Sequence, residues 1–206
     1  IDPLKLQKQV SFLEENPEYV LSHTNCNILF EEKGKVRTSA NTSNLILNSA
    51  SKDELFFALV EKKVKIYTPS VVTTLANHLK MQNDKVFKMG DTPLWLTLSQ
   101  HGKFHYLNEP TVVYRNSRGT VSRPNDRIDR ISFRLSSILM HFYYIEKYNY
   151  QIPELLFKDF EKFLIDYIKL GGHFDSYYME YLSEPAINRI RKLEKRAPYI
   201  NKISYY

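Results

Sequence analysis

The stretch FKMGDTPLWL, residues 87–96, organises the first half of the chain. Its Met-Gly pair predicts a bend, Asp91 or Thr92 is suited to cap the helix that follows, and the proline fits that helix's first turn. The apolar residues after the proline recur at helical spacing and predict a stripe that faces a core, namely Leu94, Trp95 and Leu98. The pattern places Asp91 at a helix N-terminus, either as an ordinary capping residue or as a functional carboxylate.

The composition is that of a globular chain with a sizeable core. Of the 206 residues, 43% are hydrophobic and 25% are charged. The sequence predicts neither a transmembrane helix nor a signal peptide. The single cysteine, Cys26, excludes an internal disulfide framework and favours a reducing cytoplasm. The chain opens on Ile1 without an initiator methionine, which predicts a cut inside a longer protein.

Helix and strand patterns alternate over the first 115 residues, which predicts an α/β fold. Helices are expected from residue 3 to 16, from 52 to 62 after the capping box Ser51–Glu54, and from 76 to 81. In the first of them, Leu6, Val10 and Leu13 are expected to face inward, with the Lys and Gln residues in solvent. Strands are expected at 19–30, 65–74, 104–107 and 111–115. The polar stretch 37–51 is predicted to be a mobile loop.

Residues from Asn125 onward show a different pattern. Apolar residues repeat at helical spacing, which predicts a long amphipathic helix that begins there. A second helix is expected from Pro153 to the Gly171-Gly172 pair, and a third helical region over 174–196, broken near Pro185. The chain is therefore divided into 1–123 and a C-terminal helical region, 124–206.

Read together, these pieces resemble the C-terminal half of a glycosyltransferase family two enzyme with the GT-A fold. The segments that carry the resemblance are DPLKLQKQV at 2–10, YVLSHTN at 19–25, KMGDTPLWL at 88–96, GKFHYL at 102–107 and VVYR at 112–115. The resemblance covers about residues 1–123. It implies an α/β fold, a partial GT-A-like mixed sheet with flanking helices, followed by the all-helical appendage.

The resemblance implies a sugar transfer with inversion, from a nucleotide-sugar donor to a saccharide or lipid-linked acceptor, in cell-surface polysaccharide biosynthesis. Asp91 would be the general base. The family's nucleotide-binding half and its acidic metal motif are missing from this sequence, so this fragment is expected to be inactive by itself. A divalent cation, Mg²⁺ or Mn²⁺, is expected for the full-length enzyme with ligands outside this chain. Some members carry a histidine where Ser117 stands, and no metal ligand is assigned here.

Five further residues are candidates for binding the two substrates. Gly90, Trp95 and His23 are expected on the acceptor side, where the tryptophan would stack on a sugar unless it is a core residue. Arg115 and Ser70 are expected near the donor diphosphate. Alternatively, the arginine is a surface residue, and the Thr-Pro-Ser segment at 68–70 only begins a strand.

Basic charge is concentrated in residues 115–134, which hold six arginines and two aspartates. Arg127, Arg130 and Arg134 share one helical face, which is either a solvated face balanced by nearby aspartates or a surface for anionic lipid at the inner side of the membrane. The tyrosine-rich helices beyond are suited to homo-oligomer contacts. A pI of 9.2 leaves a basic nucleic-acid-binding module, or a non-catalytic interaction domain, as rival functions. No nucleic acid is expected as a partner, because residues 1–114 are nearly neutral and carry no recognition motif.

Overall fold

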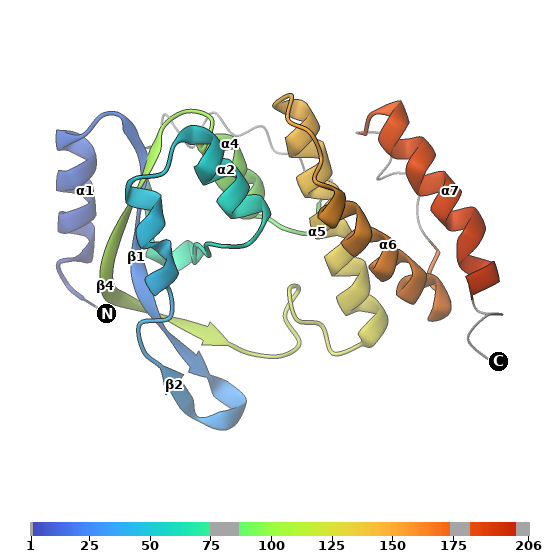
Figure 1. Cartoon of the computed structure of the whole chain (residues 1–206). Helices are drawn as coiled ribbons and strands as arrows, with labels where there is room; N and C mark the ends of the chain where they lie inside the picture. Colours follow the sequence, from blue (N-terminus) through green and yellow to red (C-terminus); the bar gives the residue numbers. More distant parts are fainter. Residues whose placement is uncertain (1, 75–86, 174–181, 201–206) are drawn as a thin grey trace. The chain divides into compact units, whose positions relative to one another are not determined.

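The computed structural model describes residues 2–74, 87–173 and 182–200 (Figure 1). The chain forms two compact units, Ile1–Asn83 with Asp91–Ser117, and Asp84–Gly90 with Arg118–Tyr206. The first unit is a mixed α/β structure, as expected from the alternating pattern, and the second is helical. The division at Ser117 lies a few residues before the predicted one at residue 123.

The first unit is built around one long strand. Its elements are α1 (Lys5–Glu15), β1 (Tyr19–Phe30), η1 (Glu31–Lys33), β2 (Lys35–Arg37), η2 (Thr42–Asn48), α2 (Lys52–Val60), η3 (Thr68–Ser70), β3 (Val71–Thr73), α4 (Thr92–Leu98) and β4 (Lys103–Asn116), where η marks a 3-10 helix. β4 pairs with β1 in parallel along its whole length, and β2 and β3 pair with β1 antiparallel. Figure 1 shows α1 on one side of this mixed sheet and α2 and α4 on the other.

The strands differ from the predicted ones in two places. The two short strands expected at 104–107 and 111–115 are one strand, β4, because register shifts on either side of Asn25 absorb Pro110 within the pairing. The strand expected at 65–74 is reduced to β3, since Pro69 lies in the 3-10 turn η3 just before it. The helix expected at 76–81 lies outside the described residues.

The buried face of α1 is shifted from the predicted one, since only Leu13 of the three residues expected to face inward is buried. Lys5 and Gln9 are buried, whereas Leu6 is 62% and Val10 41% exposed. The Gln9 side-chain amide explains the choice, since its Nε2 donates to the carbonyl oxygen of Ser22 at 2.8 Å and to that of Ser70 at 3.0 Å. These two bonds to backbone carbonyls offset part of the cost of burying the amide, although Gln9 Oε1 has no hydrogen-bond partner among the described residues.

The polar stretch predicted as a mobile loop follows β2 and contains η2, and asparagine side chains anchor it. Asn44 binds the backbone of Lys65 twice, with Oδ1 accepting from its N–H at 3.1 Å and Nδ2 donating to its carbonyl at 2.7 Å. Asn48 makes the same two bonds to Tyr106 in β4, at 2.7 and 3.0 Å. These side-chain bonds hold η2 against β4 and against the segment before η3.

The local prediction for the start of α2 is confirmed. The capping box starts α2 as predicted, because Glu54 N–H donates to Ser51 Oγ at 3.3 Å and Ser51 N–H to the Glu54 carboxylate at 2.8 Å. The helix ends at Val60, slightly earlier than expected. Cys26 is a buried strand residue, and burial raises the pKa of its thiol to about 11.

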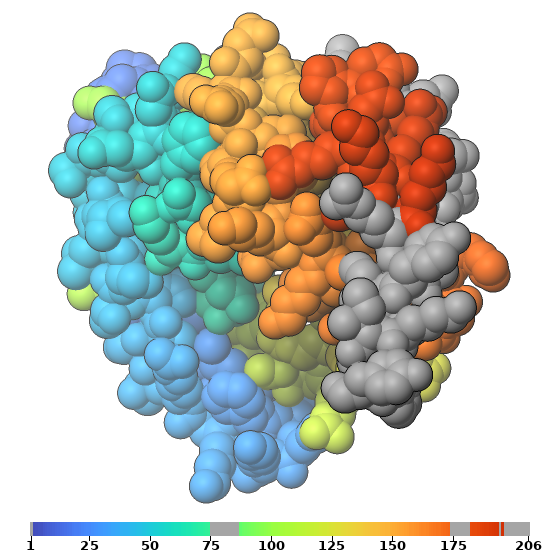
Figure 2. Space-filling view, turned by 45° about the vertical axis from the view of Figure 1, so that its right-hand side comes forward, coloured from blue at the N-terminus to red at the C-terminus, as the bar shows by residue number. Residues whose placement is uncertain are grey.

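The second unit contains α5 (Arg127–Lys147), α6 (Glu154–Lys169) and α7 (Glu184–Ile200). α6 packs against α5 and α7 lies beside α6 (Figure 2). Aromatic rings pack together in its interior, where Phe142 lies 4.6 Å from Phe157 and 5.6 Å from Phe160 between centroids. α7 begins at Glu184 with Pro185 in its first turn, where a proline needs no N–H partner, and residues 174–181 of the expected helical region lie outside the described residues.

A short piece of the first half of the chain belongs to this helical unit. Lys88 N–H donates to Ser136 Oγ at 2.9 Å, and its Nζ donates to Ser132 Oγ at 2.7 Å. Phe87 is buried and lies 5.8 Å from the ring of Tyr143. The residues just before Asp91 are therefore fastened to α5, which the sequence did not predict.

Candidate functional site

Asp91 occupies the N-cap position of α4, but its side chain does not cap the helix. Instead, Thr68 Oγ1 donates a hydrogen bond of 2.7 Å to Asp91 Oδ2. The other carboxylate oxygen, Oδ1, has only a 3.4 Å contact with the hydroxyl of Thr92. The residue is partly exposed. The carboxylate is thus oriented by a neighbouring turn and keeps one oxygen open.

The turn that orients Asp91 is itself held on two sides. Within η3, Ser70 Oγ donates to the carbonyl oxygen of Tyr67 at 2.7 Å, which closes the turn around Pro69. The Ser70 carbonyl accepts from Gln9 of α1. These bonds fix the position of Thr68, whose hydroxyl reaches Asp91. The sequence places Thr68 and Ser70 in one short segment, but it gives no sign that Gln9 supports them.

His23 lies close to this turn in the sheet but is closed off from solvent. It pairs with Val71, the residue after Ser70, and its side chain is fully buried beside the ring of Tyr106, at 4.9 Å between centroids. Burial, with the nearby His105 as a smaller cause, lowers the pKa of His23 to about 3. The imidazole is neutral at physiological pH, and in this conformation it does not reach an open surface.

The other two acceptor candidates differ in exposure. Trp95 is 4% exposed, so its indole is packed in the interior and has no open face on which a sugar could stack. Trp95 is therefore a core residue, which is the alternative that the sequence left open. Gly90 is exposed, and an added Cβ would meet nothing within 4 Å. Its backbone does not require glycine.

The two donor candidates lie at opposite ends of β1. Ser70 is buried next to the β3 pairing at Leu21–His23, and its hydroxyl is used inside η3. Arg115 pairs with Leu29, six residues further along β1 than His23 and therefore roughly 20 Å away. Its side chain is 72% exposed and contacts the Glu31 carboxylate at 3.4 Å. Ser70 therefore belongs to the same turn as Thr68, the partner of Asp91, whereas Arg115 lies far from that turn.

The basic face predicted on α5 is present in the second unit. Arg127, Arg130 and Arg134 are all exposed. Arg130 is partly engaged, because its guanidinium donates to the carbonyls of Pro124 and Asn125 at the start of the helix. No ion pair joins these arginines to Asp126 or Asp129, although the sequence allowed one.

Nothing among the described residues gathers three or more His, Cys, Asp or Glu side chains as metal ligands. Within the same residues, no helix has the length and apolar character needed to cross a bilayer. Comparison with models of known protein families, with curated proteins and with solved structures finds no match.

Proposed function

We propose that this chain forms the acceptor side of a glycosyltransferase that transfers a sugar from a nucleotide-sugar donor with inversion, and that Asp91 is its general base. The observation that supports this role is the state of the Asp91 carboxylate. It lies at a helix start, yet it makes no capping bond and is instead oriented by Thr68. A capping aspartate would have its oxygen turned to the helix N–H groups.

In the proposed reaction, a hydroxyl of a saccharide or lipid-linked acceptor approaches the open Oδ1 of Asp91. The carboxylate takes the proton as the acceptor oxygen bonds to the anomeric carbon and the nucleotide diphosphate leaves from the opposite face. A positioned base of this kind contributes about 10²–10⁴ in rate. The Thr68 hydroxyl would hold the other oxygen, so that the basic oxygen is presented in one direction.

The remaining candidates have different roles in this proposal. His23 and Trp95 are buried, so they would shape the wall behind the acceptor rather than touch it. Gly90 stays a candidate for acceptor contact. The proposed divalent cation, Mg²⁺ or Mn²⁺, would neutralise the leaving diphosphate and would be held by residues of the nucleotide-binding half. Biosynthesis of a cell-surface polysaccharide at the cytoplasmic side of the membrane is the proposed setting.

The test measures sugar transfer by the full-length enzyme, with product formation from each of a set of nucleotide sugars as the readout. Asp91→Asn should lower kcat by about 10²–10⁴, because the amide cannot take the proton. Thr68→Val should give a smaller loss, since it removes only the orienting hydrogen bond. Asp159→Asn on the exposed side of α6 is the matched control and should keep full activity. Unchanged turnover in Asp91→Asn would remove this residue from the mechanism.

A second candidate function, attraction to an anionic membrane surface, is supported by the three exposed arginines of α5. The double variant Arg127→Gln with Arg134→Gln should sediment less than the unchanged protein with vesicles that contain anionic lipid. Vesicles of neutral lipid should bind neither the unchanged protein nor the variant. Equal binding of the two proteins to anionic vesicles would argue against the arginine face. Stronger binding to duplex DNA than to vesicles would favour the nucleic-acid-binding alternative.

A further inference from the structure

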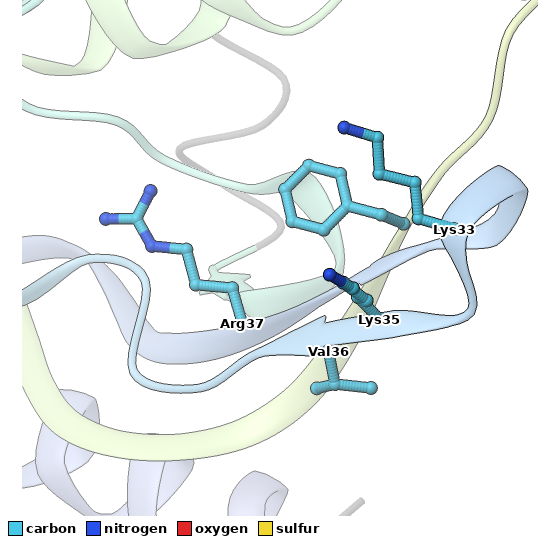
Figure 3. Close-up of a pocket in the computed structure, with 5 residues that line it drawn as sticks. Lys33, Lys35, Val36 and Arg37 are labelled. Carbon is cyan, nitrogen blue, oxygen red and sulfur yellow. The ribbon is translucent and has the colours of Figure 1, made fainter.

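The hairpin formed by β1 and β2 carries a hollow of about 300 Å³, lined by Phe30, Lys33, Lys35, Val36 and Arg37 (Figure 3). This volume is at the lower end of the range for small-molecule sites, about 300–1,000 Å³. Three of the five lining residues are cations. The hollow belongs entirely to the first unit.

The strand register places the cations of β2 on the same face as the aromatic ring. Phe30 is directly opposite Lys35, and Ile28 is opposite Arg37. Because side chains alternate along a strand, Lys35 and Arg37 project to the side of Phe30, and Val36 projects to the other side. Figure 3 shows this arrangement, with Lys33, Lys35 and Arg37 on one side of the hairpin and Val36 turned away.

One of the two acidic residues of the hairpin, Glu31, is engaged by residues of β4 and the segment after it. Arg115 pairs with Leu29, so it lies on the face that Phe30 does not share. There Arg115 contacts Glu31 at 3.4 Å, and the Ser117 hydroxyl donates to the same carboxylate. In the part of the chain that the structure describes, neither Lys33, Lys35 nor Arg37 forms an ion pair. The hollow is therefore lined by three cations that form no ion pair among the described residues.

The ring of Phe30 is held in place by the hydrophobic core of the first unit. It packs against the buried cluster of Cys26, Ile28, Tyr67 and Val112, together with Tyr114. The rings of Tyr67 and Tyr114 are 4.6 Å apart between centroids. Phe30 is only partly buried. It therefore offers a firm apolar surface next to the cations, which a flexible surface side chain would not provide.

We propose that this hairpin hollow binds a small organic phosphate. Lys33, Lys35 and Arg37 would hold the phosphate, since ammonium and guanidinium groups donate strong charge-assisted hydrogen bonds to its oxygens. Phe30 would contact the ring or apolar part of the ligand. The site is separate from Asp91, because η3 lies beside the Leu21–His23 end of β1 and the hairpin is at the Ile28–Phe30 end.

The test is a titration of the ¹⁵N-labelled 206-residue chain with adenosine 5′-monophosphate, followed by amide chemical shifts at low salt. Shifts should concentrate on Phe30–Arg37. Inorganic phosphate and adenosine, added separately, should each bind with an affinity at least about tenfold lower, because each lacks one half of the contacts. Equal binding of inorganic phosphate would overturn the role of Phe30, and shifts confined to other segments would overturn the site.

Matched variants separate the pocket from general charge. Lys35→Gln with Arg37→Gln should weaken binding at least tenfold, since two charge-assisted bonds are lost while the side-chain stems remain. Lys52→Gln with Lys169→Gln removes the same charge outside the hollow and should leave binding unchanged. Equal affinity of the two double variants would refute the proposal. Tighter binding of a single-stranded oligonucleotide than of the mononucleotide would also refute it, in favour of a polyanion surface.

Discussion

Asn44 offers a sharp test of how the segment that holds the candidate site is anchored. Its side chain is fully buried and makes two hydrogen bonds, of 2.7 and 3.1 Å, to the backbone of Lys65. The Lys65 carbonyl also accepts from Asn41 Nδ2 at 2.9 Å. Asn44→Ala removes both hydrogen bonds to Lys65, which lies in the segment just before η3.

The expected loss can be worked from these contacts. Two hydrogen bonds contribute about 1–3 kcal/mol in total, and the space left by the buried amide adds about 1 kcal/mol. Asn44→Ala should therefore lower the free energy of unfolding of the first unit by about 2–4 kcal/mol. Asn44→Asp keeps the size and the acceptor, but it turns a carboxylate oxygen toward the Lys65 carbonyl. It should be at least as destabilising.

Urea unfolding at pH 7 measures this change, with fluorescence as the probe. Trp95 is the single tryptophan of the chain and is buried in the first unit, so its emission reports on that unit. Ser43→Ala, one residue away and exposed, is the control and should change the free energy by less than about 0.5 kcal/mol. A loss below about 1 kcal/mol in Asn44→Ala, or full stability in Asn44→Asp, would refute the hydrogen-bond account.

Three further predictions concern other parts of the chain. Gly102→Ala should destabilise the first unit by about 1–3 kcal/mol in the same urea assay, because the added Cβ would come within 2.7 Å of the Glu18 carbonyl oxygen and 2.5 Å of Val20. An unchanged midpoint would contradict that close approach. The folded pKa of His23, about 3, lies below its unfolded value of 6.5, so its contribution to stability is complete above pH 6.5 and is lost as the pH falls toward 3. The loss should be at most about 1.4 kcal/mol per pH unit, and His23→Leu should flatten the profile between pH 7 and 5. Phe160→Ala should cost the helical unit about 3–5 kcal/mol by thermal or urea unfolding followed by circular dichroism, whereas the exposed Leu155→Ala should cost less than about 1 kcal/mol.

Thr68 and Asp91 show how far the candidate site can be followed from sequence. The position of Asp91 before Thr92 and Pro93 is local, and the residue does stand at the start of a helix. Whether its carboxylate caps that helix depends on a competing donor 23 residues away in the chain. A hydroxyl brought within 2.7 Å by another turn decides the orientation, and no spacing within residues 87–96 contains this information.

Elements that depend on local patterns could be predicted from the sequence. The apolar repeat predicted α5 and α6, and the Ser51–Glu54 capping box predicted the start of α2, because the interacting groups are within one or two turns of each other. The alternation of elements was enough for the α/β class of the first unit.

The buried face of α1 and the pairing of the buried polar groups depend on contacts between segments that are distant in the chain. α1 turns Gln9 inward because two carbonyls of other segments need its amide, and η2 is ordered because Asn44 and Asn48 meet backbone groups of Lys65 and Tyr106. The cationic hollow likewise exists because β2 pairs with β1 in one register. In each case the partner is distant in the chain, so the energy of the contact cannot be read from local composition.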